Sequence, residues 1–249
     1  MSDPSYPFLT AIAATFFIAG IVKGVTGMGL PTVAMGVLGA LISPLAAASL
    51  LIVPSFVTNV WQLLAGPQFT SIMRRLWLMM LAIIVGTVLG SSWLASGNTR
   101  LTTVALGGSL VVYAGYTLFA RQIRIPQHWE RWLSPAIGAT TGIVTGGTGV
   151  FVIPAVPYLQ ALGLEKDELV QALGLSFTVS TVALAGGLGY RGAFKLDTLT
   201  LSALAVIPAL GGMWAGQLIR NRISPATFRR CFLLCLLVLG AEMTLKSIF

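Results

Sequence analysis

Long apolar runs separated by short charged loops are the strongest constraint on how this chain can fold. The runs cover residues 8–42, 44–65, 75–95, 101–120, 134–161, 169–189, 197–218 and 227–247. Charged side chains make up only 9% of the 249 residues, whereas a typical soluble domain contains about 25%. The sequence therefore predicts an all-α polytopic membrane protein in which residues 1–249 form a single integral membrane domain.

Two of these runs are too long for one membrane crossing and too short for two. About 20 apolar residues cross a bilayer once, but the runs 8–42 and 134–161 contain 35 and 28 residues. A glycine-rich stretch interrupts each of them, GVTGMGLP at 24–31 and TGGTGVFVIP at 145–154. Because glycine and proline both weaken helices, each long run is predicted to be a re-entrant or hairpin segment broken near its middle.

The order of the segments indicates an internal duplication. Sliding the chain by 120 residues places Gly147-Thr148-Gly149 on Gly27-Met28-Gly29, and one further residue places Ser176-Phe177 on Ser55-Phe56. Each broken run is followed by three ordinary apolar segments. We therefore expect two repeats of about 120 residues, covering 8–120 and 134–249, joined by a basic linker at 121–133. A chance match of small residues is the alternative, since glycine is frequent in membrane helices.

Loop charges bear on the orientation of the two repeats, because cytoplasmic loops carry an excess of Lys and Arg. If every apolar run crosses once, the basic loop residues divide into eight and six. If each broken run enters and leaves by one face, the second half is inverted and the division becomes ten and four. The four are Arg100, Arg191, Lys195 and Lys246. The stronger bias favours inverted repeats with both termini outside and the linker in the cytoplasm.

The two breaks are the predicted binding site. Irregular backbone inside a membrane is tolerated where it is buried in protein or lines a water-filled cavity. Matched breaks in inverted halves are typical of a transporter site near the middle of the membrane, and helix N-termini attract anions there. The substrate-binding candidates are Thr26, Gly27, Met28 and Gly29 in the first break, and Thr145, Gly147, Thr148 and Gly149 in the second.

Polar residues near the breaks extend this site. Asn59, Ser176 and Ser180 are further substrate-binding candidates, because Asn59 follows Ser55 by four residues and Ser180 follows Ser176 by the same step. Ser55 and Lys23 are candidates for substrate binding or for coupling, and Lys23 is a charge placed well inside an apolar run. Two alternatives stay open: the small polar residues allow close helix packing, and Lys23 faces water at the tip of its segment.

Other classes of function are disfavoured. The sequence contains no paired intramembrane carboxylates, metal-ligand spacing, Ser–His–Asp set or P-loop, so we expect a protein that is not an enzyme and has no metal or cofactor. The net charge of +8 is distributed over short loops, which argues against nucleic acid as a partner. The expected partners are a small anion and the bilayer, with a homodimer also possible.

The two glycine-rich segments are similar to those of a known family. GIVKGVTGMGLPTVAMGVL and GIVTGGTGVFVIPAVPYLQALGL, together with eight apolar segments in about 250 residues, resemble the TauE/SafE family of sulfite exporters over essentially the whole chain. The resemblance implies a bacterial inner-membrane carrier that moves sulfite or small organosulfur anions, such as sulfonates and sulfoacetate, with coupling to the proton gradient. A passive small-anion channel and a structural membrane subunit of a larger complex are the alternatives.

Overall fold

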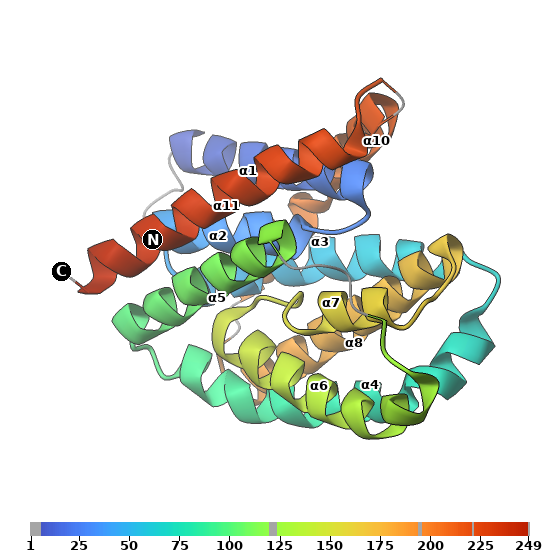
Figure 1. Cartoon of the computed structure of the whole chain (residues 1–249). Coiled ribbons are helices and arrows are strands. Elements are labelled where there is room, and N and C mark those ends of the chain that lie inside the picture. The colour runs from blue at the N-terminus through green and yellow to red at the C-terminus, as the bar shows by residue number, and fades with distance from the viewer. Residues whose placement is uncertain (1–5, 120–123, 194–195, 221, 249) are drawn as a thin grey trace.

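The structure is a computed structural model that describes residues 6–119, 124–193, 196–220 and 222–248. Within these ranges the chain is helical and contains no strand (Figure 1). The helices are α1 (Tyr6–Thr26), α2 (Leu30–Leu41), α3 (Pro44–Leu64), α4 (Phe69–Ala95), α5 (Thr99–Phe119), α6 (Gln127–Thr148), α7 (Ala155–Ala161), α8 (Lys166–Tyr190), α9 (Leu196–Leu204), α10 (Val206–Arg220) and α11 (Pro225–Ile248). The prediction of an all-α protein is confirmed.

Several helices have the length and hydropathy that a membrane crossing requires. Among the described residues, six segments meet both conditions: α1, α3, α4, α5, α8 and the stretch Thr198–Arg220 that runs from α9 into α10. The shorter α2 is apolar as well. The chain is therefore a polytopic membrane protein, as its charge content predicted.

Both long apolar runs break where the glycines lie. The first becomes α1 and α2, separated by Gly27, Met28 and Gly29; the two glycines have φ angles of 78° and 102°. The second becomes α6 and α7, and α6 ends at Gly149 with a φ of 71°. Side chains rarely adopt such positive φ angles, which explains why glycine occupies these positions.

Local sequence signals begin α3 and α8, the helices that come after α2 and α7. Ser43 caps α3, and its side chain accepts a hydrogen bond from Ala46 N at 3.2 Å. Glu165 and Glu168 form a capping box at the start of α8, which satisfies backbone N–H groups that have no partner inside the helix. The acidic cluster at 165–168 is thus the N-terminus of α8.

Glycines allow the helices of the two halves to pack closely. Helix α1 packs on α10, and α6 packs on α4. A β-carbon at Gly20 would lie 2.2 Å from the Ala209 carbonyl oxygen, and one at Gly142 would lie 2.4 Å from that of Ile83. Helices α3 and α8 also pack together, as do α5 and α11 (Figure 1). Each of these pairs joins one helix from each half, which two equivalent repeats would produce.

Hydrogen bonds at the breaks correct the predicted register of the repeat. Gly27 N donates to Lys23 O and Gly149 N donates to Thr145 O, both at 2.8 Å. The Thr26 hydroxyl donates to Val22 O at 2.8 Å, and that of Thr148 donates to Val144 O at 2.7 Å.

These matching contacts pair Gly27 with Gly149, an offset of 122 residues. The predicted pairing of Gly29 with Gly149 was therefore wrong. It aligned glycine spacing alone and missed that GIVKGVTG and GIVTGGTG are equivalent segments.

Side-chain contacts place Arg75 and Arg191 near opposite ends of α4. Arg75, near the start of α4, forms an ion pair with Glu130 at 2.7 Å and lies 3.4 Å from the Leu162 carbonyl oxygen. Arg191 instead donates to the Ser91 hydroxyl, near the opposite end of α4, at 3.3 Å. If every apolar run crossed the membrane once, Arg75 and Arg191 would lie on the same side of the membrane. Inverted repeats place them on opposite sides. The inverted orientation in the membrane stays a prediction.

Candidate anion-binding site

Lys23 is a buried lysine in the last turn of α1, and its side chain is held by neutral groups of α3. Only 4% of the residue is exposed. Its Nζ donates to Thr58 Oγ1 at 3.2 Å and to Asn59 Oδ1. Among the described residues, ion pairs are formed by Arg75 and by Lys246, and no carboxylate pairs with Lys23. An ammonium group in this setting is suited to an anionic ligand, because a buried charge is costly without a partner.

Asn59 connects Lys23 to the second half of the chain. Its Oδ1 accepts from Lys23, and its Nδ2 donates to Thr181 Oγ1 of α8 at 3.4 Å. Thr58 is in turn fixed by its own hydroxyl, which donates to Pro54 O at 2.8 Å. The lysine therefore lies next to the contact between α3 and α8, the pair of helices that carries the predicted polar residues.

The predicted serines are buried on these two helices. Ser55, Ser176 and Ser180 have no exposed surface, and none of their hydroxyls has a hydrogen-bond partner among the described residues. More than about nine in ten buried polar groups in proteins are hydrogen-bonded. Unpartnered hydroxyls on both helices leave hydrogen-bonding capacity for a small polar ligand or for water.

A cavity of about 600 Å³ reaches Lys23 from one end of the helix bundle. A neighbouring cavity of about 690 Å³ has Gly27, Lys166 and Arg220 in its wall as well. Thr26 and Met28, two of the predicted residues, line this second cavity. The charged residues that line the two cavities in the described part of the chain are all basic: Lys23, Arg124, Lys166, Arg220 and Arg229. Such a surface attracts anions toward the buried lysine.

Gly27 is the break residue at which the backbone borders open space. A β-carbon there would have no atom within 4 Å, and the residue lines both cavities. At Gly29 a β-carbon would lie 2.9 Å from Val22 Cγ1, and at Gly149 it would lie 2.8 Å from Met35 Sδ. Neither Gly29 nor Gly149 lines either cavity. Both are packed against side chains, so the structure does not place them at this site.

The second break also lies away from these cavities. The Thr145 hydroxyl donates to Val150 O at 3.2 Å, and the Thr148 hydroxyl donates to Val144 O at 2.7 Å. Gly147 lies against the ring of Trp93, since a β-carbon there would be 3.5 Å from it. Both hydroxyls are therefore hydrogen-bonded within the break, and neither threonine lines the two basic cavities. Of the two breaks, the first alone contributes residues to these two cavities, and an anion cradle formed by both breaks stays a prediction.

A comparison with protein families identifies the family of the chain. The family model described as sulfite exporter TauE/SafE matches residues 12–243. The chain belongs to the TauE/SafE family. The matched range includes both breaks and every basic residue that lines the two cavities. Comparisons with curated proteins and with solved structures gave no match. As a TauE/SafE protein with several apolar helices, the chain is a transmembrane transport protein.

Several residues of the candidate site in this TauE/SafE protein were not among the sequence candidates. Thr58 contacts Lys23 directly. The sequence around Thr58 contains no pattern that predicts this contact. Lys166, Arg220 and Arg229 were interpreted only as loop charges that orient the chain. Their common position around one cavity depends on how α8, α10 and α11 meet. An excess of basic loop residues at one end of the bundle is the signal that points to them.

Proposed function

We propose that this protein is a secondary transporter that carries a small sulfur-containing anion, sulfite or an organosulfonate such as sulfoacetate, across the bacterial inner membrane. The observation that carries the proposal is the buried ammonium group of Lys23, held by Thr58 and Asn59 at the inner end of a basic cavity. Membership of the TauE/SafE family supports the class of substrate.

The arrangement can bind an anion in two stages. Arg220 and Lys166 line both cavities and raise the local concentration of anions. An anion that reaches the inner end can then accept a hydrogen bond from Lys23 in competition with the neutral oxygens of Thr58 and Asn59. Gly27 leaves room beside the lysine for the oxygen atoms of the ligand.

We infer proton coupling from the charges around Lys23. The other charged residues in the wall of its cavity, Lys166 of α8 and Arg220 of α10, are positive, and the α3 groups that it contacts are neutral. A bound anion and a bound proton at Lys23 therefore favour each other, because opposite charges attract strongly where water is scarce. The proposed carrier moves one proton on Lys23 with each anion.

We also propose that the basic end faces the cytoplasm. The contacts of Arg75 and Arg191 lie toward opposite ends of α4, which supports inverted repeats, and the larger basic group is then expected on the cytoplasmic side. The two basic cavities then open toward the cytoplasm.

Flux in proteoliposomes tests this function. Labelled sulfite, sulfate, thiosulfate and sulfoacetate are supplied with and without a pH gradient. A carrier of the proposed kind gives saturable flux of sulfite or sulfoacetate that a pH gradient drives. Non-saturable flux that ignores the pH gradient indicates a passive channel, and an absence of flux for all four anions contradicts the proposal.

A further inference from the structure

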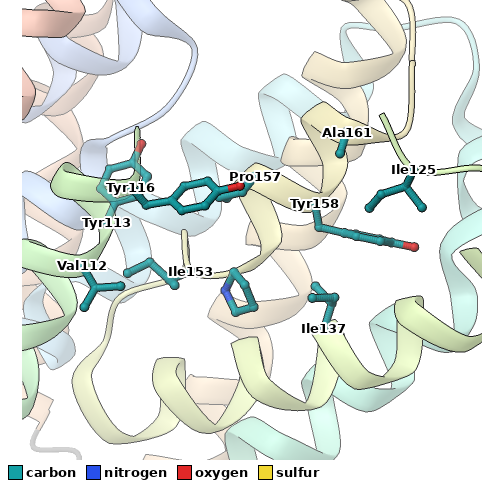
Figure 2. A pocket seen from close by; sticks show the side chains of 10 residues that line it. Val112, Tyr113, Tyr116, Ile125, Ile137, Ile153, Pro157, Tyr158 and Ala161 are labelled. Atoms are coloured by element: carbon teal, nitrogen blue, oxygen red, sulfur yellow. The ribbon is translucent and has the colours of Figure 1, made fainter. Parts of the chain in front are cut away.

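An apolar cavity lies apart from the basic ones. It has a volume of about 440 Å³ and is enclosed by α5, α6 and α7 (Figure 2). Val112, Tyr113 and Tyr116 of α5 form one wall, and Ile137 of α6 forms another. None of the residues that line it is charged. The cavity is therefore suited to an apolar ligand and not to the transported anion.

The buried polar atoms around this cavity are already hydrogen-bonded. The Tyr113 hydroxyl donates to Met28 Sδ at 3.6 Å. The hydroxyls of Tyr158 and Ser134 are hydrogen-bonded at 2.6 Å. The cavity wall consequently presents the rings of these tyrosines, whose hydroxyls need no polar partner from a ligand.

The cavity opens on the surface of the bundle that faces lipid. Val112 is 59% exposed and Tyr116 is 47% exposed, and both lie on α5, which has the length and hydropathy of a membrane span. Ile125 lines the cavity a few residues before the exposed Trp129 and Trp132. Tryptophans of this kind mark the level of the lipid headgroups, so a phospholipid anchored there can direct a chain into the cavity.

We propose that this cavity binds one acyl chain of a membrane phospholipid. The chain would contact Ile153 and Pro154 of the second break directly. It would also contact Tyr113, whose hydroxyl holds Met28 of the first break. Because Met28 lines a basic cavity, a bound acyl chain supports the backbone next to the anion site as well as the second break.

Photolabelling tests this proposal without any measurement of transport. The full chain is reconstituted in nanodiscs of phosphatidylcholine that carries a diazirine in one acyl chain, irradiated and mapped by peptide mass spectrometry. We expect label within residues 153–158, of which Ile153, Pro154, Pro157 and Tyr158 line the cavity. Label confined to outward-facing side chains such as Val238 and Leu245 would overturn the proposal.

Two variants and a control make the test specific. Val112→Trp fills the cavity from α5 and Ile137→Phe fills it from α6, so each should remove the label from residues 153–158. Val238→Trp adds the same bulk at an exposed valine of α11 and should leave that label unchanged. Thermal stability in detergent shows which variants are folded, and a folded filling variant that keeps full label at 153–158 contradicts the proposal.

Discussion

At the scale of single residues, Gly27 and Gly29 show that two glycines of one break have different roles. Both have positive φ angles, but only Gly27 borders open space beside Lys23. An alanine at such a backbone angle is strained by about 1–2 kcal/mol, so substitution of either glycine should lower stability. The loss of anion binding is expected at Gly27, where a methyl group would project toward the cavities.

The variant Gly27→Ala tests this difference, with Gly97→Ala as its matched control. Gly97 has a φ of 75°, close to the 78° of Gly27, and a β-carbon at Gly97 would likewise have no atom within 4 Å. Both variants should show a similar small decrease in melting temperature. Only Gly27→Ala should weaken sulfite binding, measured by calorimetry. Equal sulfite affinities in the two variants would remove Gly27 from the site.

At the scale of single elements, α3 contains a proline, and a serine of α9 forms hydrogen bonds with the α3 backbone near it. Pro54 lies inside α3 and cannot donate a backbone hydrogen bond. Ser202 of α9 compensates in this region: its hydroxyl donates to Leu50 O at 2.7 Å and accepts from Val53 N at 3.1 Å. Thr58 and Asn59, which contact Lys23, follow about one turn beyond this irregular turn.

Two serine variants should therefore differ in stability: one should lose stability and the other should not. Ser202→Ala leaves buried groups of α3 without a partner and should destabilise the fold by about 1–3 kcal/mol. Ser180→Ala removes a buried hydroxyl that has no partner among the described residues, so the ligand-free protein should be as stable as the wild type or more so. Melting temperatures in detergent, without added anion, compare the two. A larger loss for Ser180→Ala than for Ser202→Ala would contradict this account of the α3 and α8 contact.

The sequence predicted the elements better than it predicted the site. Lys23 was recognised because a charge inside an apolar run is conspicuous, and the breaks were recognised because glycine and proline weaken helices. The register of the breaks was missed by two residues, since glycine spacing alone does not show which carbonyl each N–H meets. The roles of Thr58 and Arg220 depended on contacts between elements far apart in the sequence, which no local pattern encodes.

At the scale of the whole molecule, the helix pairs and the basic groups support inverted repeats. Single cysteines at Ser224 and Trp132 test the basic end, and one at Asn98 tests the other, in a background without Cys231 and Cys235. A membrane-impermeant thiol reagent added to intact cells should label the Asn98 site and spare the other two. Labelling of only one of the Ser224 and Trp132 sites would contradict inverted repeats and would favour a topology in which every apolar run crosses the membrane once.

The central claim is that Lys23 binds the transported anion, and sulfite affinity of Lys23→Met tests it most directly. Methionine fills a similar volume without a charge, so the fold should persist, as melting in detergent can verify. Loss of a hydrogen bond to a charged group costs about 1.5–3 kcal/mol, which predicts a roughly ten- to hundredfold weaker affinity. Lys246→Met, at an exposed surface pair, is the control and should bind as the wild type does. Wild-type sulfite affinity in folded Lys23→Met protein would contradict the account.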